Sequence, residues 1–371
     1  MKKMKKQLVK LLNIQAPSGE EHKVVKYVKP ILKSLCDKVW LDDYKNLLAE
    51  KKVGSGKGAT IILSAHMDSV SNIIKDRVVY ESNGTFYSTK GILGADDRAG
   101  IAILLAVLRN VEKTAFEGTI KVAFSREEEI GCVGSQKIDP EWIKGSDLAI
   151  VVDRRGNNDI VVGNYSQAFC SNEVGKFFED CSALQDMNWQ ATEGGISDAC
   201  TFAELNVNAV NLSAGYRNEH TEKEYVVYKD MQKTVKLILQ ALASVNDFAG
   251  SFGDVPLSNN WVEGFDGGAY YDYWNDYADD YEDLWEGRDQ YGTVTSSIVD
   301  GNVCITQRVG EASDEVYISK TTFEKIIRAY ERNKVANSYT SYLTDNTLPS
   351  AGGLSEAEKV VIEKHGKIGT F

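Results

Sequence analysis

The chain has little of what marks several classes of protein. Its six cysteines are scattered and form no CxxC pair, so a reduced, cytoplasmic protein is the simplest expectation. No run approaches the roughly 20 apolar residues of a membrane span. No basic patch of the kind that binds nucleic acid is present. We therefore expect a cytoplasmic protein that binds neither membrane nor nucleic acid.

The N-terminus resembles a secretion signal only in its charge. Residues 1–6 are basic, but Lys10, Asn13 and Gln15 interrupt the apolar stretch that a signal peptide needs. Leucines at helical spacing follow instead, so we expect this segment to be part of the folded domain.

Charge divides the chain unevenly. The total is -12 over 371 residues. Residues 1–250 hold 32 basic and 33 acidic side chains, whereas residues 251–371 hold 10 and 21. We predict a large domain over 1–248, an acidic and aromatic-rich linker or packing segment over 249–292, and a small C-terminal region over 293–371.

Buried-type strands alternate with helices in the large domain. This alternation predicts an α/β fold with a mixed, mostly parallel central sheet, covered by helices on both faces. A hairpin is expected around Asn83-Gly84, a strong turn signal. The strands are expected at 60–65, 119–125, 148–152 and 207–212, and the helices at 21–37, 199–205 and 230–246.

One stretch, Gly91 to Gly100, places two adjacent carboxylates before an apolar helix. Acids at a helix start can simply cap it and suit its dipole. Alternatively, Asp96 faces away from the helix and is shared by two metal ions. The second interpretation requires further ligands at the same place.

Such ligands follow the predicted buried strands. His66, Glu128 with Glu129, and Asp153 come at the ends of three strands, and His220 lies in the loop after a fourth. Open α/β sheets place their sites at the carboxyl ends of strands. Each residue alone could be a core histidine, a solvated acid or a turn residue, but their convergence favours a metal site.

These residues lie in motifs that resemble the co-catalytic dinuclear zinc exopeptidases, the group of peptidase T, carboxypeptidase G and glutamyl aminopeptidase. The ordered set covers roughly residues 5–245, and it is specific although each piece alone is weak. The motifs are Ala65-His66-Met67-Asp68, Gly94-Ala95-Asp96-Asp97-Arg98-Ala99-Gly100, Glu128-Glu129-Ile130-Gly131, Asp153, Gly194-Gly195-Ile196-Ser197-Asp198-Ala199 and Asn218-Glu219-His220-Thr221.

The resemblance implies two divalent metal ions, Zn²⁺ first and Co²⁺ or Mn²⁺ as alternatives, that bridge a water molecule. Asp96 would bridge the metals. His66 and Asp153 would complete one site, and Glu129 and His220 the other. Imidazole and carboxylate ligands suit zinc independently of the resemblance.

Two further residues receive catalytic roles from the resemblance. Glu128 would be the general base that takes a proton from water and passes it to the leaving amine. Asp68 would orient the His66 imidazole. Successive side chains on a strand diverge, so one ligand and one base is a sensible division between Glu129 and Glu128.

Several neighbouring residues keep two interpretations. Ser197 and Asp198 either support the site or cap a helix. Tyr216 or Arg217 could supply an oxyanion contact or be plain loop residues. The free amine of a substrate could bind to an acidic side chain near the site. By charge alone, the candidates are Glu127, Asp97 and Asp153.

The chain departs from the family in having no room for a lid domain. Only residues 69–95 and 154–193 are available where members carry an insertion of roughly 100 residues. Lid residues help bind a substrate carboxylate in such members, so we expect an aminopeptidase that acts on peptides. The alternatives are an amidohydrolase or deacylase for small N-acyl substrates, and a metal-binding relative without turnover.

The C-terminal region has no family counterpart. It is expected to be a small α+β appendage, with a hairpin around Asp300-Gly301 and helices at 319–334 and 355–367. Its many aromatic residues favour packing against its own domain or another chain. A homo-oligomer formed through this region, or a cover over the site, is the resulting hypothesis.

Overall fold

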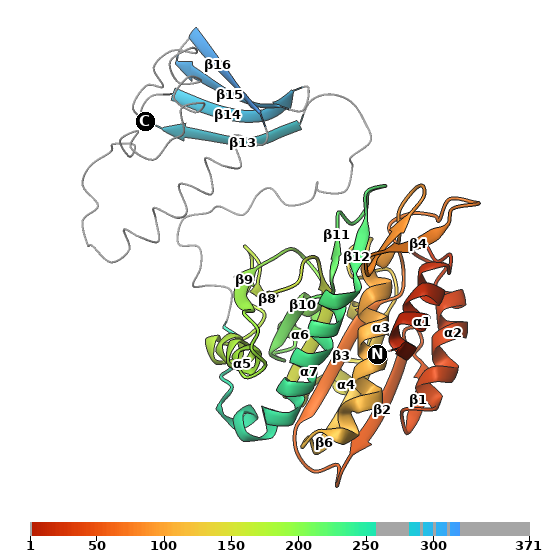
Figure 1. The fold of residues 1–371 in the computed structure, drawn as a ribbon. Coiled ribbons are helices and arrows are strands. Elements are labelled where there is room, and N and C mark those ends of the chain that lie inside the picture. The colour runs from red at the N-terminus through yellow and green to blue at the C-terminus, as the bar shows by residue number, and fades with distance from the viewer. Residues whose placement is uncertain (1, 257–281, 290–291, 300–301, 310–311, 320–371) are drawn as a thin grey trace. The chain divides into compact units, whose positions relative to one another are not determined.

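The computed structural model describes residues 2–256, 282–289, 292–299, 302–309 and 312–319. They belong to two units, Met1–Phe265 and Asp266–Phe371, and each is considered by itself. Figure 1 shows the first unit as a sheet between layers of helices. The predicted α/β class is therefore confirmed.

The central sheet has eight strands in the order β1-β2-β6-β3-β7-β10-β8-β9. Its strands are β1 (Lys38–Leu41), β2 (Leu47–Val53), β3 (Thr60–His66), β6 (Gly118–Ser125), β7 (Leu148–Arg154), β8 (Asp159–Gly163), β9 (Gln190–Glu193) and β10 (Ala209–Ser213). Pairing is parallel through β6, β3, β7 and β10 and again between β8 and β9. The other pairs are antiparallel, so the sheet is mixed as predicted.

Helices cover both faces because alternate strand residues are apolar on both sides. In β3, Ile61 and Leu63 belong to one core cluster and Ile62 to the other. The first cluster includes residues of α1, α2, α3, α5 and α7, and the second includes residues of α4 and α6. The helices are α1 (Lys2–Leu12), α2 (His22–Lys33), α3 (Ala95–Asn110), α4 (Pro140–Ile143), α5 (Asn172–Ala183), α6 (Asp198–Glu204) and α7 (Tyr228–Phe248), with 3₁₀ turns at Val111–Lys113, Ser135–Lys137 and Ala249–Ser251.

A second, antiparallel sheet has the order β11-β12-β5-β4. Its strands are β4 (Val79–Ser82), β5 (Thr85–Ser88), β11 (Tyr216–Arg217) and β12 (Tyr225–Val227). Asn83 and Gly84 both have positive φ, at 49° and 79°, as the predicted tight turn requires. This sheet is important for the site because the loop between β11 and β12 carries His220.

The second unit contains a four-stranded antiparallel meander of β13 (Glu282–Asp289), β14 (Gly292–Val299), β15 (Asn302–Val309) and β16 (Ala312–Ser319). The hairpin predicted around Asp300-Gly301 is present as β14 and β15, and a strand on each side was missed. Ser319 ends β16 and does not begin a helix. The rest of the helix predicted at 319–334, and all of that at 355–367, lie outside the described residues.

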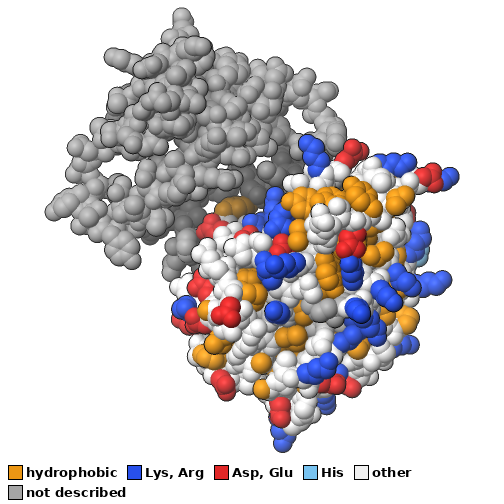
Figure 2. All heavy atoms as spheres, viewed as in Figure 1, with side chains coloured by type: hydrophobic (Ala, Val, Ile, Leu, Met, Phe, Trp, Pro, Cys, Tyr) orange, Lys and Arg blue, Asp and Glu red, His pale blue; other side chains and the backbone are white. Residues whose placement is uncertain are grey.

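The surface of the first unit mixes charges of both signs. Figure 2 shows basic side chains gathered over the lysine-rich helices α1 and α2. Among the described residues, no helix combines the length and apolar character needed to cross a bilayer.

Candidate metal centre

The structure brings the five residues predicted as metal ligands to one edge of the central sheet. His66 is the last residue of β3, and Asp153 lies near the end of β7. Glu129 follows β6, which pairs with β3. The sheet edge assembles these groups because the carboxyl ends of parallel strands meet there.

Asp96 reaches the same place from the start of α3. Gly94, the residue before this helix, has the left-handed conformation (φ 69°, ψ 34°). Asp96 and Asp97 have non-helical backbone angles within the first turn. The chain therefore turns into the helix with the Asp96 carboxylate directed at the strand ends.

The Asp96 carboxylate lies between two histidines. Its Oδ1 is 2.9 Å from His66 Nε2, and its Oδ2 is 3.3 Å from His220 Nε2. The two oxygens therefore face imidazoles that come from different sheets. This arrangement is the one required of a carboxylate shared by two cations.

The other acids flank the two histidines. Asp153 Oδ1 lies 3.4 Å from His66 Nε2, and Glu128 Oε2 lies 3.9 Å from the same nitrogen. Glu129 Oε2 lies 2.9 Å from His220 Nε2. His66, Asp153 and Glu128 thus form one group, and His220 and Glu129 lie on the other side of Asp96.

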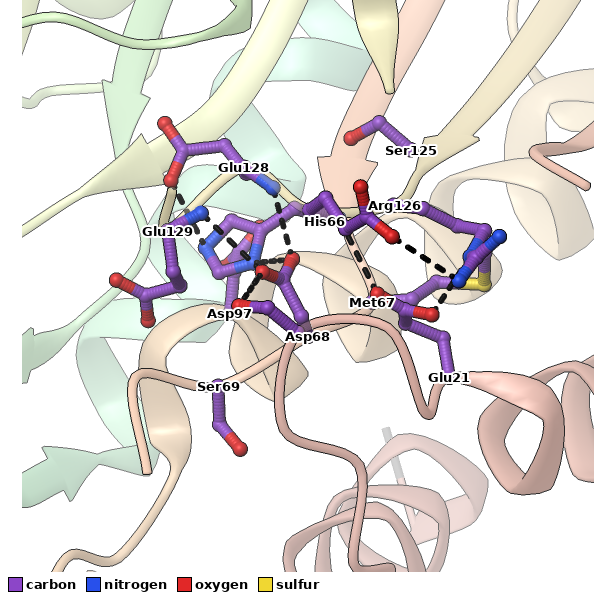
Figure 3. A network of polar contacts seen from close by, with 12 residues as sticks. Glu21, His66, Met67, Asp68, Ser69, Asp97, Ser125, Arg126, Glu128 and Glu129 are labelled. Carbon is purple, nitrogen blue, oxygen red and sulfur yellow. Dashed lines mark hydrogen bonds and ion pairs between the residues drawn. The ribbon is translucent and has the colours of Figure 1, made fainter. Parts of the chain in front are cut away.

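Asp68 anchors both the His66 ring and the acidic loop after β6, as Figure 3 shows. Its Oδ1 lies 3.2 Å from His66 Nδ1 and accepts the backbone N–H of Glu128 at 3.1 Å. Its Oδ2 accepts the backbone N–H of Glu129 at 3.2 Å and the Ser18 hydroxyl at 2.7 Å. Asp68 is fully buried, so these contacts fix it rigidly.

The electrostatics of this cluster reflect carboxylates crowded into a buried space. Burial, reinforced by the charge of Asp153, raises the pKa of Glu128 and of Asp97 well above the usual range. Burial raises the pKa of Asp153 to about 7, and the Asp96 charge adds to this.

The histidines and Asp96 respond in the opposite direction. Burial would lower the pKa of His66, but the carboxylates of Asp153, Asp68 and Asp96 raise it well above its usual value. The pKa of His220 rises to about 11 although burial opposes this, because Asp96 and Glu129 face it. The cluster therefore favours positive charge at its centre.

The donor set fits divalent cations. Three groups of side chains have ligand atoms within 4.8 Å of one another among the described residues; they are His66 with Glu128 and Asp153, His66 with Asp96 and Glu129, and Asp96 with Asp97 and Asp153. Nitrogen and oxygen donors of this kind suit zinc, cobalt or manganese. Asp97 Oδ2 is buried without a hydrogen-bond partner, which leaves one more acceptor beside the cluster.

Asp97 also has a structural contact. Its Oδ1 accepts the Gly100 backbone N–H at 2.8 Å, so it caps the first turn of α3. This hydrogen bond is the one expected of an acid that caps a helix, so Asp97 has the structural role considered for it in the sequence.

The remaining candidates have partners of their own. Ser197 is the N-cap of α6 and accepts the Ala199 N–H, while the buried Asp198 accepts the Ser125 hydroxyl. Glu127 accepts the Tyr44 hydroxyl and pairs with Arg126 at 3.2 Å.

Tyr216 and Arg217 have different partners. The Tyr216 side chain is buried and donates its hydroxyl to Asp153 Oδ1 at 3.0 Å. Arg217 pairs with Asp230 at 3.3 Å. Tyr216 thus contacts a predicted ligand, whereas its place in the sequence suggested only an oxyanion contact or a plain loop residue.

Two further buried residues hold the site and were not identified from the sequence. Arg98 donates to the carbonyl oxygens of Met67 and Asp68, at 2.6 and 2.8 Å, and so holds the chain just after β3. Glu224 accepts backbone N–H groups at the start of α3. In the sequence, only the position of Arg98 next to Asp97 points to a role for this arginine, and nothing points to Glu224.

Comparison with known proteins identifies related chains. The family model of the M42 glutamyl aminopeptidases matches residues 73–237. A protein of Pyrococcus furiosus named as a LysW-lysine/LysW-ornithine hydrolase is 28% identical over 158 residues, 42% of this chain and 43% of that protein. Peptidase T of Edwardsiella ictaluri is 38% identical over 80 residues, 21% and 19% of the two chains. The match spans less than half the length of either relative.

Among solved structures, aminopeptidase PepT from Bacillus cereus is similar, with a TM-score of 0.60 and 17% identity. The similarity covers 66% of this chain and 98% of that one, and at this identity it concerns the fold. The M42 family model spans Asp96, Glu128, Glu129, Asp153 and His220, whereas His66 and Asp68 lie just before it. The chain is thus similar to the M42 glutamyl aminopeptidases over residues 73–237 and shares the fold of aminopeptidase PepT.

Proposed function

We propose that this protein is a metal-dependent exopeptidase, and more specifically an aminopeptidase. The observation that carries the proposal is the position of Asp96, whose two carboxylate oxygens each face a different histidine. A buried carboxylate held in this way between two imidazoles needs a reason, and two bound cations supply it.

The proposed ligands divide about Asp96. His66 and Asp153 serve one ion, Glu129 and His220 the other, and zinc is the expected metal. Metal ions held by these residues would supply Lewis-acid chemistry for the scissile carbonyl and would lower the pKa of a bound water to about 7. The cluster of acids and imidazoles supports this assignment through its donor chemistry and its charge.

Glu128 is proposed as the general base. Its Oε2 lies at the same imidazole as Asp153, while its Oε1 accepts from the Cys132 thiol at 3.3 Å. The carboxylate takes a proton from the attacking water and returns it to the departing amine. Asp68 contacts both the Glu128 backbone N–H and the His66 ring, so it fixes the position of the proposed base relative to one proposed ligand.

The preference for an aminopeptidase comes from what lies beside the site. Residues 69–95 contain the hairpin of β4 and β5, and residues 154–193 contain β8, α5 and β9. Neither described interval forms a separate lid domain that could bind a substrate carboxylate. The peptidase T match and the PepT-like fold support the same choice.

A second candidate is hydrolysis of another amide bond. The Pyrococcus furiosus relative is named as a LysW-lysine/LysW-ornithine hydrolase. A small N-acyl substrate would use the same metals and base as a peptide, so the candidate site supports both. The substrate therefore has to be determined directly.

The decisive experiment measures metal content and hydrolysis together on the full chain. Elemental analysis should find two metal ions per chain. They should be zinc, or cobalt or manganese where one of these has been added. Aminoacyl anilides and dipeptides should be cleaved, whereas N-acyl amino acids and carboxypeptidase substrates should not. Preferential cleavage of N-acyl substrates would favour the second candidate. If the metal-loaded protein cleaves none of these substrates, the proposed enzymatic function is refuted.

Assembly and location are proposals of a separate kind. We propose a cytoplasmic homo-oligomer that assembles through the C-terminal region, on the grounds of its acidic and aromatic composition. Light scattering of the full chain tests the assembly. A monomeric mass at every concentration would contradict it.

A further inference from the structure

The buried side chain of Glu224 connects two parts of the proposed metal site. It lies in the loop between β11 and β12, four residues after His220, and it is 2% exposed. Its Oε2 accepts the Gly94 N–H at 2.7 Å. Its Oε1 accepts the N–H groups of Ala95 and Asp96, at 2.6 and 3.1 Å.

These three donors are the unpaired backbone groups at the beginning of a helix. The first N–H groups of any helix lack intrahelical partners, and the helix dipole favours negative charge beside them. Gly94 has no side chain with which to cap α3. A carboxylate from the distant residue Glu224 performs that role, and one of the groups it holds belongs to Asp96 itself.

A buried cation grips the preceding residues. Arg77 donates from one nitrogen to the carbonyl oxygens of Ile92 and Leu93, each at 3.0 Å. The other terminal nitrogen donates to the carbonyl of Leu12. The backbone before Asp96 is therefore held through its carbonyl groups by Arg77 and through its N–H groups by Glu224.

The second connection is through the chain. His220 is the most exposed of the proposed ligands, with 41% of its side chain accessible. Few packing contacts can therefore fix it. Glu224 closes the same loop and ties it to the backbone that carries Asp96. Both oxygens of Glu224 already accept backbone N–H groups, so it acts through Asp96 and His220 and is not itself a ligand.

We propose that Glu224 is a positioning residue that sets the spacing of Asp96 and His220. It thereby determines the affinity for the metal ion held on the His220 side of the site. This inference rests on the proposed metal centre. It adds that a negative charge is needed at position 224, since an amide would present its NH₂ group to N–H donors.

The test uses Glu224→Gln in the full chain, with Asp147→Asn as a control at an exposed carboxylate. Asp147 also accepts a backbone N–H, from Thr60 at 2.7 Å, but at the opposite end of β3. Metal-free proteins are titrated with Co²⁺ and followed by its visible absorption. We expect Glu224→Gln to weaken one Co²⁺ equivalent about 10-fold or more. The control should match the wild type.

The weakened equivalent should be the one that His220→Ala abolishes. Wild-type affinity in a folded Glu224→Gln protein, or equal loss at both equivalents, would overturn the inference. If the glutamine variant does not fold, Glu224→Asp replaces it. The shorter side chain keeps the charge but reaches fewer donors, so wild-type affinity there would also overturn the inference. A wild type that binds no Co²⁺ or Zn²⁺ would instead refute the metal centre.

Discussion

The Tyr216 hydroxyl donates a hydrogen bond of 3.0 Å to Asp153 Oδ1. Tyr216 is 1% exposed, so this donor has been removed from water and has a fixed direction. The same oxygen of Asp153 lies 3.4 Å from His66 Nε2. The tyrosine therefore orients a proposed ligand through the oxygen that faces His66.

Tyr216→Phe should weaken metal binding on the Asp153 side. Removal of a partner that orients a ligand typically lowers metal affinity about 10- to 100-fold. Competition with a chromophoric chelator measures the affinity. Tyr80→Phe, at a side chain that is 45% exposed, serves as the control. Equal affinity in the Tyr216 variant and the wild type would contradict the orienting role.

Glu128→Gln and Glu128→Ala should retain both metal ions and lose activity by a factor of about 100 to 10,000. The reason is that proton transfer by a positioned group contributes this much. Turnover of an aminoacyl anilide and metal content are measured on the same samples. Glu141→Gln is the control, since that residue is exposed. An active Glu128→Ala variant would refute the base assignment.

Asp68→Asn should affect both stability and metal binding. An amide can replace only some of the bonds that Asp68 accepts from Ser18 and from the backbone of Glu128 and Glu129. A buried donor left unpaired costs about 1–3 kcal/mol. Thermal unfolding of the metal-free protein and a zinc titration should both shift. A change in neither would contradict the anchoring role.

Removal of metal should lower the unfolding temperature. Acids that converge on His66 and His220 repel one another when no cation is present. A metal at 1,000 times its Kd stabilises by about 4 kcal/mol. Calorimetry with and without a chelator measures the difference. The His220→Ala variant should show a smaller shift, and an identical unfolding temperature in both wild-type samples would contradict the prediction.

The ion pair of Glu21 and Arg126 should be important for stability. Glu21 Oε2 is 2.6 Å from Arg126 Nε (Figure 3). Glu21 Oε1 accepts the Gly19 and Glu127 N–H groups. Because Glu21 is 1% exposed, Glu21→Gln leaves Arg126 with Glu127 as its one carboxylate partner and should lower the free energy of unfolding by about 1–3 kcal/mol.

The comparison for this stability measurement is the exposed pair of Glu141 and Lys144. Glu141→Gln should change the free energy of unfolding by less than about 1 kcal/mol, because water screens such pairs. Denaturant unfolding of both variants measures the difference. Similar effects of the two substitutions would contradict the distinction.

Much of the central sheet could be predicted because its signals are local. Thr60 to Ala65 is apolar on both faces, and such a run forms a buried strand wherever it lies. Asn83-Gly84 specifies its turn through the positive φ that both residues adopt. The strands on each side of the C-terminal hairpin were not predicted. For β13 the reason is that the acidic and aromatic composition of its segment outweighed its strand pattern.

The sequence by itself determined which groups carry the proposed chemistry. His66, Asp96 and Glu128 stand in motifs of fixed spacing, and parallel strands bring their carboxyl ends to one edge. Only the tertiary structure decided what holds these groups in place. Tyr216 in β11 contacts the site through one hydrogen bond, and Glu224 in the following loop through three, and neither leaves a pattern in the neighbouring residues. Ligand identity follows from local spacing, whereas ligand geometry follows from contacts between distant segments, and only folding creates those.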